Sequence, residues 1–99
     1  MWILKASDVD ADSQTFRVTP GAIKTFGRAP RADFILDAPL VSRLHCRLEA
    51  GDETLDVIDL SSTNGTYVNG KRITRAQLAS GDTLRIGRVE LKVEKTQNV

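Results

Sequence analysis

Residues 46–57 read CRLEAGDETLDV, two short runs in which apolar and polar residues alternate on either side of a glycine-containing turn. Successive side chains of a strand point to opposite faces, so each run has one apolar face and one polar face. The segment Ala50-Gly51-Asp52 between the runs is a turn signal. This stretch therefore predicts two antiparallel strands joined by a short connection.

The same rhythm extends in both directions from this stretch. No window keeps apolar residues at helical spacing over the length of a typical helix, and only Arg75 to Ala79 could form a single helical turn. We therefore expect an all-β protein in which two sheets pack face to face, in preference to a closed barrel. Further alternating runs are Thr15–Val18, Leu84–Ile86 and Val89–Val93, and further turn signals are Pro20-Gly21, Asn64-Gly65, Asn69-Gly70 and Ser80-Gly81-Asp82.

The composition is that of one ordinary globular domain, with 99 residues, 40% of them hydrophobic and 27% charged. We expect a single domain over residues 1–95 and a short C-terminal tail over residues 96–99. The apolar start, Met1 to Leu4, is too short for a signal peptide or a membrane span. With Cys46 as the only cysteine and His45 as the only histidine, neither an internal disulfide nor a zinc site is expected. These features predict a cytoplasmic protein with no cofactor and no membrane partner.

Charge is segregated along the chain although the net charge is only +1. Residues 24–47 and 64–75 are mainly basic, whereas residues 48–63 contain acidic side chains and no basic ones. Basic loops in a near-neutral protein suit one small anionic ligand better than a nucleic acid, which usually requires a basic stripe and a high isoelectric point. A small nucleic-acid-binding barrel remains an alternative, but Trp2, Tyr67 and the phenylalanines are too scattered to form an obvious base-stacking platform. The basic residues that suggest it are Arg28, Arg31, Arg43, Lys71, Arg72 and Arg75.

Three connecting segments carry polar motifs at characteristic spacing. They are Gly27-Arg28, Ser42-Arg43-Leu44-His45 and Ser61-Ser62-Thr63-Asn64-Gly65. Together with the turn Val68-Asn69-Gly70 and the closing segment from Ser80-Gly81-Asp82 to Ile86-Gly87, they resemble the forkhead-associated (FHA) domain. The resemblance follows the family's order over nearly the whole chain.

This resemblance implies an eleven-stranded antiparallel β-sandwich of two twisted sheets, with the functional loops at one end. It also implies a non-catalytic interaction module whose partner is a protein segment in which a Ser/Thr kinase has phosphorylated a threonine. The phosphate contacts implied are Arg28, Ser42, Arg43 and Thr63, while Asn64 holds the peptide backbone beside the phosphothreonine. The supporting residues implied are Gly27, His45, Gly65 and Asn69.

The chemistry of these residues agrees with the resemblance. A phosphate dianion needs charge-assisted donors, and an arginine guanidinium offers a planar bidentate fork that hydroxyl and backbone N–H groups complete. The amide of Asn64 can both donate to and accept from a peptide main chain. For Asn69 we favour a structural role, because Asn-Gly is typical of a type I′ turn. Members of the family often select the third residue after the phosphothreonine, and Leu40 is the candidate selector here, with an apolar preference.

Two apparent catalytic motifs carry little weight. His45 follows Ser42 by three residues, which suggests a nucleophile and its base, but it stands where an alternating strand begins and is better interpreted as a loop-bracing residue. Its neighbour Cys46 points to the opposite face of that strand. The stretch from Gly65 to Arg72 resembles a nucleotide-binding P-loop, yet Arg72 replaces the hydroxyl residue that binds magnesium. We therefore predict that the chain is not an enzyme.

One further reading of an FHA-like chain stays open. The module could bind its partner without a phosphate, through a different face of the sandwich, or could assemble with itself. Unphosphorylated and phosphorylated partners would then compete equally. We favour the phosphothreonine-dependent reading and expect a monomer.

Overall fold

The computed structural model describes residues 1–6 and 14–96. The described residues form eleven strands and no helix, which confirms the all-β prediction. No helix among them is therefore long and apolar enough to cross a membrane. The strands are β1 (Trp2–Ala6), β2 (Thr15–Val18), β3 (Ile23–Gly27), β4 (Phe34–Ile35), β5 (Cys46–Ala50), β6 (Leu55–Asp59), β7 (Thr66–Val68), β8 (Lys71–Ile73), β9 (Arg75–Leu78), β10 (Thr83–Ile86) and β11 (Val89–Lys95).

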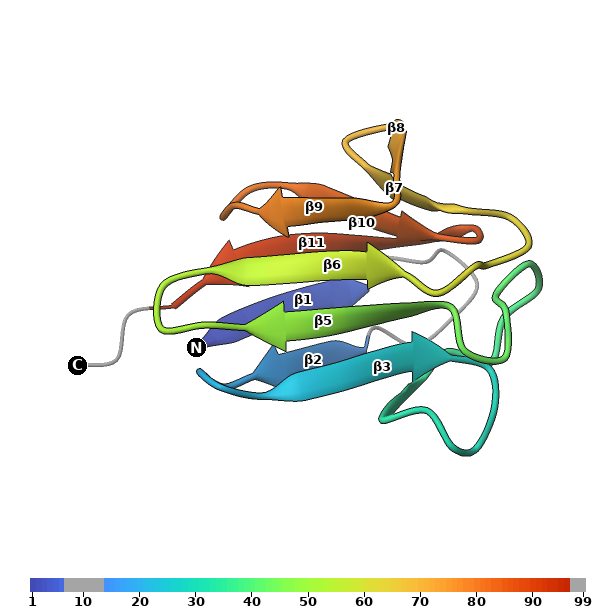
Figure 1. Cartoon of the computed structure of the whole chain (residues 1–99), viewed down its shortest axis with the longest axis horizontal. Coiled ribbons are helices and arrows are strands. Elements are labelled where there is room, and N and C mark those ends of the chain that lie inside the picture. The colour runs from blue at the N-terminus through green and yellow to red at the C-terminus, as the bar shows by residue number, and fades with distance from the viewer. Residues whose placement is uncertain (7–13, 97–99) are drawn as a thin grey trace.

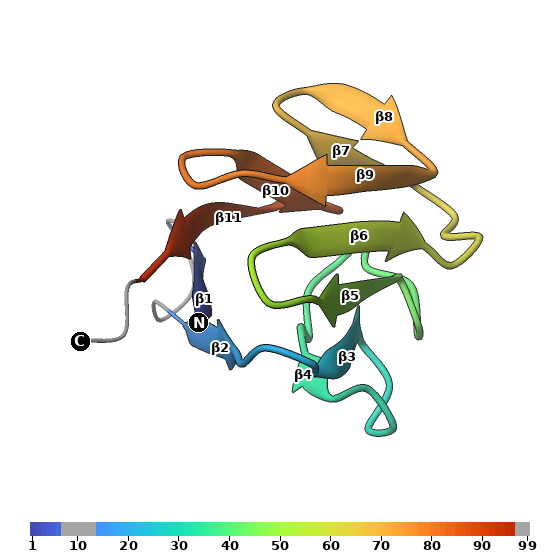
Figure 2. The same cartoon turned by 60° about the vertical axis from the view of Figure 1, so that its left-hand side comes forward.

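The strands form two sheets that pack as a sandwich (Figure 1). One sheet has the order β2-β1-β11-β10-β7-β8 and the other has the order β4-β3-β5-β6-β9. In the rotated view, β1, β2 and β11 lie on one side of the molecule and β3, β5 and β6 on the other (Figure 2). The chain thus passes from the five-stranded sheet to the six-stranded sheet in the connection between β6 and β7.

Two local predictions need correction. The sheets are not antiparallel throughout, because the two-residue β4 pairs parallel to β3, with Phe34 beside Phe26. The single helical turn that the sequence allowed from Arg75 to Ala79 does not form either. Residues Arg75–Leu78 form β9, which pairs antiparallel to β6 and sets Leu78 opposite Leu55. Burial of Leu78 against the core decides the conformation of a run whose residues have no strong strand preference.

The alternating residues supply the core. In β5 and β6 the alternate positions are buried and the residues between them are partly exposed; the buried positions are Cys46, Leu48, Ala50, Leu55 and Val57. Phe26 of β3 is wholly buried and its ring meets Phe16 of β2 edge-on, at 5.1 Å between centroids, which joins the two sheets. Each fully buried large apolar side chain contributes roughly 1.5–3 kcal/mol relative to an exposed one. The core also anchors the connection between β4 and β5, because Leu36 and Val41 of that connection are buried in it.

The three motif-bearing connections lie at the same end of the sandwich. They are residues 28–33 between β3 and β4, residues 36–45 between β4 and β5, and residues 60–65 between β6 and β7. Figure 1 shows them together on the right, whereas the termini lie on the left. At the terminal end Thr96 donates its backbone N–H to the carbonyl of Met1 at 2.9 Å, and the rest of the predicted tail, residues 97–99, lies outside the described residues.

Candidate functional site

The end of β3 brings Arg28 against the neighbouring loop. Gly27 is buried, and a Cβ at this position would lie 2.0 Å from the carbonyl oxygen of Arg43, so only glycine fits. The backbone N–H of Arg28 donates to the carbonyl of Ser42 at 3.0 Å, and that of Ala29 donates to the carbonyl of Arg43 at 3.1 Å. These two bonds fix the main chain and leave the Arg28 side chain exposed.

Ser42 links this loop to the connection between β6 and β7. Its Oγ accepts a hydrogen bond from the backbone N–H of Thr63 at 3.0 Å. A hydroxyl that accepts in this way still has its own proton to donate. The structural bond and an outward hydrogen bond to a ligand are therefore compatible in Ser42.

His45 is wholly buried between the same two connections. Its Nδ1 accepts the backbone N–H of Ser42 at 3.0 Å, so the ring proton belongs on Nε2, which donates to the carbonyl of Gly65 at 2.8 Å. Both ring nitrogens are thus occupied by backbone partners, and neither is free to act as a base. Burial raises the pKa of the adjacent Cys46 thiol, which makes it a poor nucleophile.

The connection between β6 and β7 is shaped by a carboxylate that sequence reasoning missed. Asp59 Oδ1 accepts hydrogen bonds from the hydroxyls of Ser62, at 2.5 Å, and Thr66, at 2.7 Å, while Oδ2 accepts the backbone N–H of Ser62 at 3.2 Å. Burial acts to raise the pKa of Asp59, but these hydrogen bonds outweigh it and hold the pKa below its ordinary value. Ser62 Oγ in turn accepts the N–H of Gly65 at 3.0 Å. The spacing Asp59-x-x-Ser62 was the signal available in the sequence.

Five of the predicted residues line one hollow, and Arg43 lines another. A hollow of about 270 Å³ is lined by Arg28, Leu40, Val41, Ser42, Thr63 and Asn64. A second hollow of about 350 Å³ is lined by Arg28, Ala29, Pro30, Asp37 and Arg43. Arg28 borders both hollows, so Arg43 belongs to the side of the site that lies across Arg28 from Ser42. Val41 is the lining residue that sequence reasoning did not name.

Leu40 stands at the rim of the first hollow and is 46% exposed. Its backbone adopts a φ of 72°, a left-handed conformation that is costly for leucine and requires support. Asn64 supplies part of that support, because its side-chain Nδ2 donates to the carbonyl of Leu40 at 3.2 Å. The backbone of Leu40 also packs on Gly87, where a Cβ would lie 3.0 Å from the Leu40 carbonyl carbon.

The two Asn-Gly pairs differ in structure. Asn69 and Gly70 have φ values of 51° and 83°, as a type I′ turn between β7 and β8 requires. The Asn69 side chain donates to Asp82 and accepts the N–H of Thr83, which ties this turn to the start of β10. In the other pair only Gly65 has a positive φ, 89°, so Asn64 is not part of such a turn.

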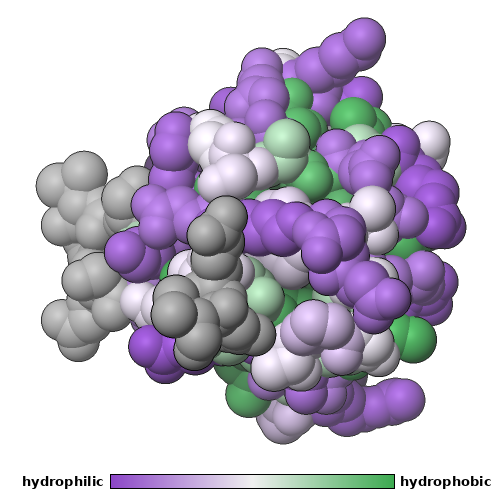
Figure 3. All heavy atoms as spheres, turned by 90° about the vertical axis from the view of Figure 1, so that its left-hand side faces the viewer, coloured by the Kyte–Doolittle hydropathy of each residue, from purple (hydrophilic) through white to green (hydrophobic). Residues whose placement is uncertain are grey.

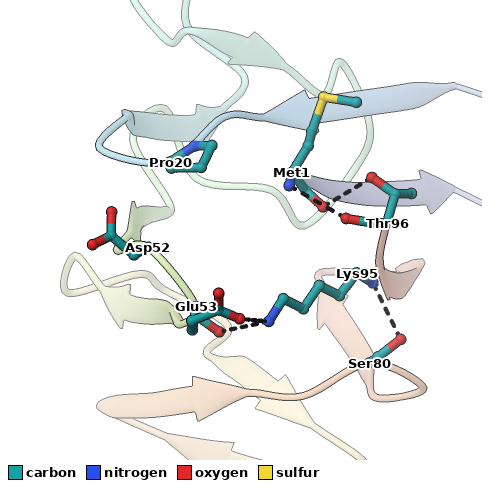
Figure 4. Close-up of a pocket in the computed structure, with 7 residues that line it drawn as sticks. All are labelled: Met1, Pro20, Asp52, Glu53, Ser80, Lys95 and Thr96. Carbon is teal, nitrogen blue, oxygen red and sulfur yellow. Dashed lines mark hydrogen bonds and ion pairs between the residues drawn. The ribbon is translucent and has the colours of Figure 1, made fainter. Parts of the chain in front are cut away.

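A further hollow, of about 600 Å³, lies at the opposite end of the sandwich, near the termini (Figure 4). The ammonium of Lys95 crosses it to pair with the carboxylate of Glu53, and the N–H of Lys95 donates to Ser80 Oγ at 3.1 Å. The surface of this end, apart from the grey atoms, is largely hydrophilic (Figure 3). The Lys95 ammonium is already paired with Glu53, so it is less available to an anion than the exposed guanidinium of Arg28 is.

Metal ligands are not gathered anywhere in residues 1–6 and 14–96, which contain no group of three or more His, Cys, Asp or Glu side chains able to hold an ion. What converges instead is an exposed guanidinium, two hydroxyls and a side-chain amide beside apolar Leu40 and Val41. Such a set of donors, carried on loops of a rigid β-sandwich, is typical of a module that recognises a partner through an anionic group.

Comparison with known proteins identifies the family. The sequence profile of the FHA domain matches residues 24–87, and the chain belongs to this family. Among curated relatives, the glycogen accumulation regulator GarA of Mycobacterium tuberculosis is 41% identical over 70 residues, which are 71% of this chain and 43% of GarA. The oxoglutarate dehydrogenase inhibitor of Corynebacterium diphtheriae is 42% identical over 67 residues, which are 68% of this chain and 47% of the inhibitor. The chain thus matches less than half the length of each of these relatives.

Solved structures agree with the family assignment. The FHA domain of FhaA, crystallised with the intracellular domain of Rv3910, is 33% identical, with a TM-score of 0.85 over 95% of this chain and all of that one. A domain solved in a study of phosphothreonine-dependent FHA domain interactions is 32% identical, with a TM-score of 0.84 over 98% of both chains. An FHA domain of Chlamydia trachomatis has a TM-score of 0.91 over 97% of this chain and 98% of that one, at 24% identity, and shows the fold alone.

Proposed function

We propose that this chain is a non-catalytic module that binds an extended, phosphothreonine-containing segment of a partner protein. One observation carries the proposal: the hollow lined by Arg28, Ser42, Thr63 and Asn64, residues that come from three separate connections. A relative that is 32% identical was solved in a study of phosphothreonine-dependent interactions, which supports the same ligand for this chain.

Arg28 supplies the charge that a phosphate dianion requires. It is exposed, it borders both hollows, and it takes part in none of the ion pairs found within residues 1–6 and 14–96. The hydroxyls of Ser42 and Thr63 add neutral donors on one side, and Arg43 adds a second guanidinium on the other. Charge-assisted hydrogen bonds of this kind are about twice as strong as neutral ones.

The apolar wall of the hollow determines whether phosphothreonine or phosphoserine is preferred. Leu40 and Val41 give the hollow an apolar wall against which the methyl group of phosphothreonine can pack. One methyl group in such a pocket contributes ~1–3 kcal/mol to discrimination, so phosphothreonine is preferred over phosphoserine by a finite factor. Leu40 also favours an apolar residue at the third position after the phosphothreonine. Strong enrichment of Asp at that position in an oriented phosphopeptide library would contradict this preference.

The remaining attributes follow from the same reading. The module needs no cofactor and no nucleic acid, and it acts as a monomeric domain over residues 1–95. A single thiol, buried and unpaired, suits the reducing conditions of the cytoplasm. The kinase that phosphorylates the partner belongs to the Ser/Thr class, because the mark is a phosphothreonine.

Calorimetric titration with matched phosphothreonine, phosphoserine and unmodified peptides tests the proposal. We expect the phosphothreonine peptide to bind at least about 100-fold more tightly than the unmodified one, and we expect Arg28→Ala to abolish that binding. Omission of the phosphate and removal of the Arg28 guanidinium each eliminate a charge-assisted contact. The thermal midpoint of Arg28→Ala should hardly change, because its side chain is exposed.

Arg31→Ala is the matched control for this titration. Arg31 is an exposed arginine of the same connection but lines neither hollow, so its removal should leave the affinity almost unchanged. Equal binding of the unmodified peptide would contradict the proposal and favour a phosphate-independent interaction. Unchanged affinity in Arg28→Ala would remove Arg28 from the site.

A further inference from the structure

A row of charged and aromatic side chains crosses the outer face of the six-stranded sheet beside the site. The strand register sets Arg72 of β8 opposite Tyr67 of β7, Tyr67 opposite Arg85 of β10, and Arg85 opposite Glu90 of β11. The neighbouring positions Thr66, Leu84 and Ile86 are buried, so alternation places the row on the solvent face. We call Arg72, Tyr67 and Arg85 the arginine strip.

Arg85 lies against the tyrosine of the strip, and Arg72 lies close to it. The Cζ atom of Arg85 stands 4.3 Å from the centroid of the Tyr67 ring, a cation–π contact that holds the guanidinium in place. Arg72 approaches from the other strand, because a Cβ added to Gly65 would lie 2.8 Å from Arg72 Nε and 3.2 Å from Tyr67 Cε2. The strip therefore presents two guanidinium groups within three adjacent strands, and the Tyr67 ring holds that of Arg85 in place.

Neither guanidinium has an anionic partner in the part of the chain that the structure describes. The ion pairs found there involve Arg47, Arg75 and lysines, but not Arg72 or Arg85, and Glu90 at the end of the row makes none. Arg85 Nε is also buried without a hydrogen-bond partner. Arg47 Nε shares this property, yet its guanidinium has Glu49 at 2.9 Å. An external anion would therefore displace no internal ion pair of the described residues when it binds either guanidinium of the strip.

The strip adjoins the candidate site. Arg72 packs on Gly65, the residue that follows Asn64 in the wall of the first hollow, and His45 holds the carbonyl of Gly65 from the interior. The hairpin of β7 and β8 that carries Arg72 and Tyr67 directly follows the connection between β6 and β7, one of the motif-bearing connections, as both ribbon views show (Figures 1 and 2). An extended peptide advances about 3.3 Å per residue, so a segment anchored in the hollow can reach the strip with residues close to its phosphothreonine.

We propose that the arginine strip binds a second anionic group of the same partner segment, an acidic side chain or a second phosphate that flanks the phosphothreonine. This inference rests on the proposed function, because the hollow beside Arg28 supplies the anchor. Guanidinium groups pair with carboxylates and phosphates in the same bidentate geometry, so both sources satisfy the strip. The strip selects partners by the charge around their phosphothreonine, whereas Leu40 selects one apolar position.

Calorimetric titration of a phosphothreonine peptide with neutral flanks, and of derivatives with Asp placed at each flanking position in turn, tests the proposal. We expect one or two positions at which Asp tightens binding by about 5- to 20-fold in the wild type, as for a partly exposed charge pair at an interface. A second phosphorylated residue at the same positions distinguishes the two sources: a larger gain than with Asp identifies phosphate, and an equal or smaller gain identifies a carboxylate. The Arg85 Nε–H resonance should shift with the acidic peptide and not with the neutral one.

The variants Arg72→Gln and Arg85→Gln should lose the gain while retaining the wild-type affinity for the neutral peptide. Arg17→Gln is the matched control, because Arg17 is an exposed cation of the same sheet on the distant edge strand β2, and it should keep the gain. Thermal midpoints of all variants exclude misfolding as the cause. No gain at any position, or a gain that persists in both strip variants, would overturn the inference and leave phosphothreonine binding intact. Failure of every phosphopeptide to bind the wild type would overturn the proposed function, and this inference with it.

Discussion

His45 shows how one buried side chain can organise two loops. Its ring accepts the N–H of Ser42 and donates to the carbonyl of Gly65, so the two connections that carry the hydroxyl and amide groups of the hollow meet on it. A buried polar network of this kind is stable only when every member is satisfied. We therefore expect His45 to contribute to binding by positioning its neighbours, without contacting the ligand.

We predict that His45→Ala lowers the free energy of unfolding by roughly 2–4 kcal/mol, since it removes a buried ring and leaves two backbone groups unsatisfied. The folded fraction should also bind the phosphothreonine peptide at least about 10-fold more weakly, because Ser42 and Gly65 lose their common support. Denaturant unfolding and titration below the thermal midpoint measure the two effects.

Val57→Ala provides the control for this variant. Val57 is wholly buried in β6, away from the loops, and its truncation should lower stability without changing the affinity of the folded protein. If His45→Ala and Val57→Ala weakened binding equally, the effect would be one of stability alone and the positioning role would be wrong.

Single residues also mark what local sequence can reveal about the site. Gly27, Arg28 and Ser42 were found because their spacing is part of a recognisable motif, and the structure brings the last two to one hollow. The direction of the Asn64 amide was not predictable, because its acceptor is the carbonyl of Leu40 in another loop. Side-chain targets across loops depend on the packing of both loops, which no spacing within one of them encodes.

At the scale of the elements, the connection between β6 and β7 depends on the ionised form of Asp59. The carboxylate accepts hydrogen bonds from Ser62 and Thr66, and its pKa in the folded protein is therefore below the value of 3.8 that applies to an unperturbed aspartate. The unfolded chain consequently takes up this proton at a higher pH than the folded one does. The stabilisation that the Asp59 carboxylate provides is complete above the pKa of this group in the unfolded chain, and it is lost as the pH falls through its pKa in the folded protein.

We predict that Asp59→Asn flattens the acid limb of the stability curve. The variant should lose roughly 1–3 kcal/mol at neutral pH, because an amide cannot accept all three hydrogen bonds, and its remaining stability should fall less than that of the wild type below about pH 4. Urea unfolding midpoints across the acidic range measure this difference. Phosphopeptide affinity at neutral pH should fall as well, since the loop that carries Thr63 and Asn64 loses its support.

Asp33→Asn is the control for Asp59→Asn, because it removes a carboxylate with a lowered pKa without changing the connection between β6 and β7. Asp33 also has a lowered pKa, owing to hydrogen bonds from the backbone and hydroxyl of Thr25, but it lines neither hollow. This variant should keep its phosphopeptide affinity. Parallel stability curves for the wild type and Asp59→Asn would contradict the assignment of the acid limb to Asp59.

The elements themselves were predictable to different degrees. Strands with strict alternation and a buried apolar face, such as β5 and β11, were evident from the sequence. The strand β9 was not, because its run Arg-Ala-Gln-Leu suits a helix as well, and pairing with β6 decides its conformation. The arginine strip could not be predicted either, since Arg72 and Arg85 are distant in sequence and meet through the register of β8, β7 and β10.

At the scale of the whole molecule, the site joins the two sheets. Arg28 and Ser42 belong to connections within the five-stranded sheet, whereas Thr63 and Asn64 lie in the connection that crosses to the six-stranded one. The family and the fold followed from sequence because motif order and strand rhythm extend over the whole chain. A ligand held by all of these connections stabilises the sandwich as a unit rather than one sheet alone.

We therefore predict that the phosphothreonine peptide slows native-state hydrogen exchange of the slowest amides in both sheets, including β11, which lies beyond the site. A ligand that binds only the folded state stabilises it by about 2.7 kcal/mol at a hundredfold excess over Kd, and each kcal/mol raises the thermal midpoint of a domain of this size by roughly 4–8 °C. The same peptide should leave Arg28→Ala unchanged in both measurements. Slower exchange confined to β3, β4 and β5 would instead mean that the two sheets unfold separately, because a ligand spanning one cooperative unit protects all of its slowest amides equally.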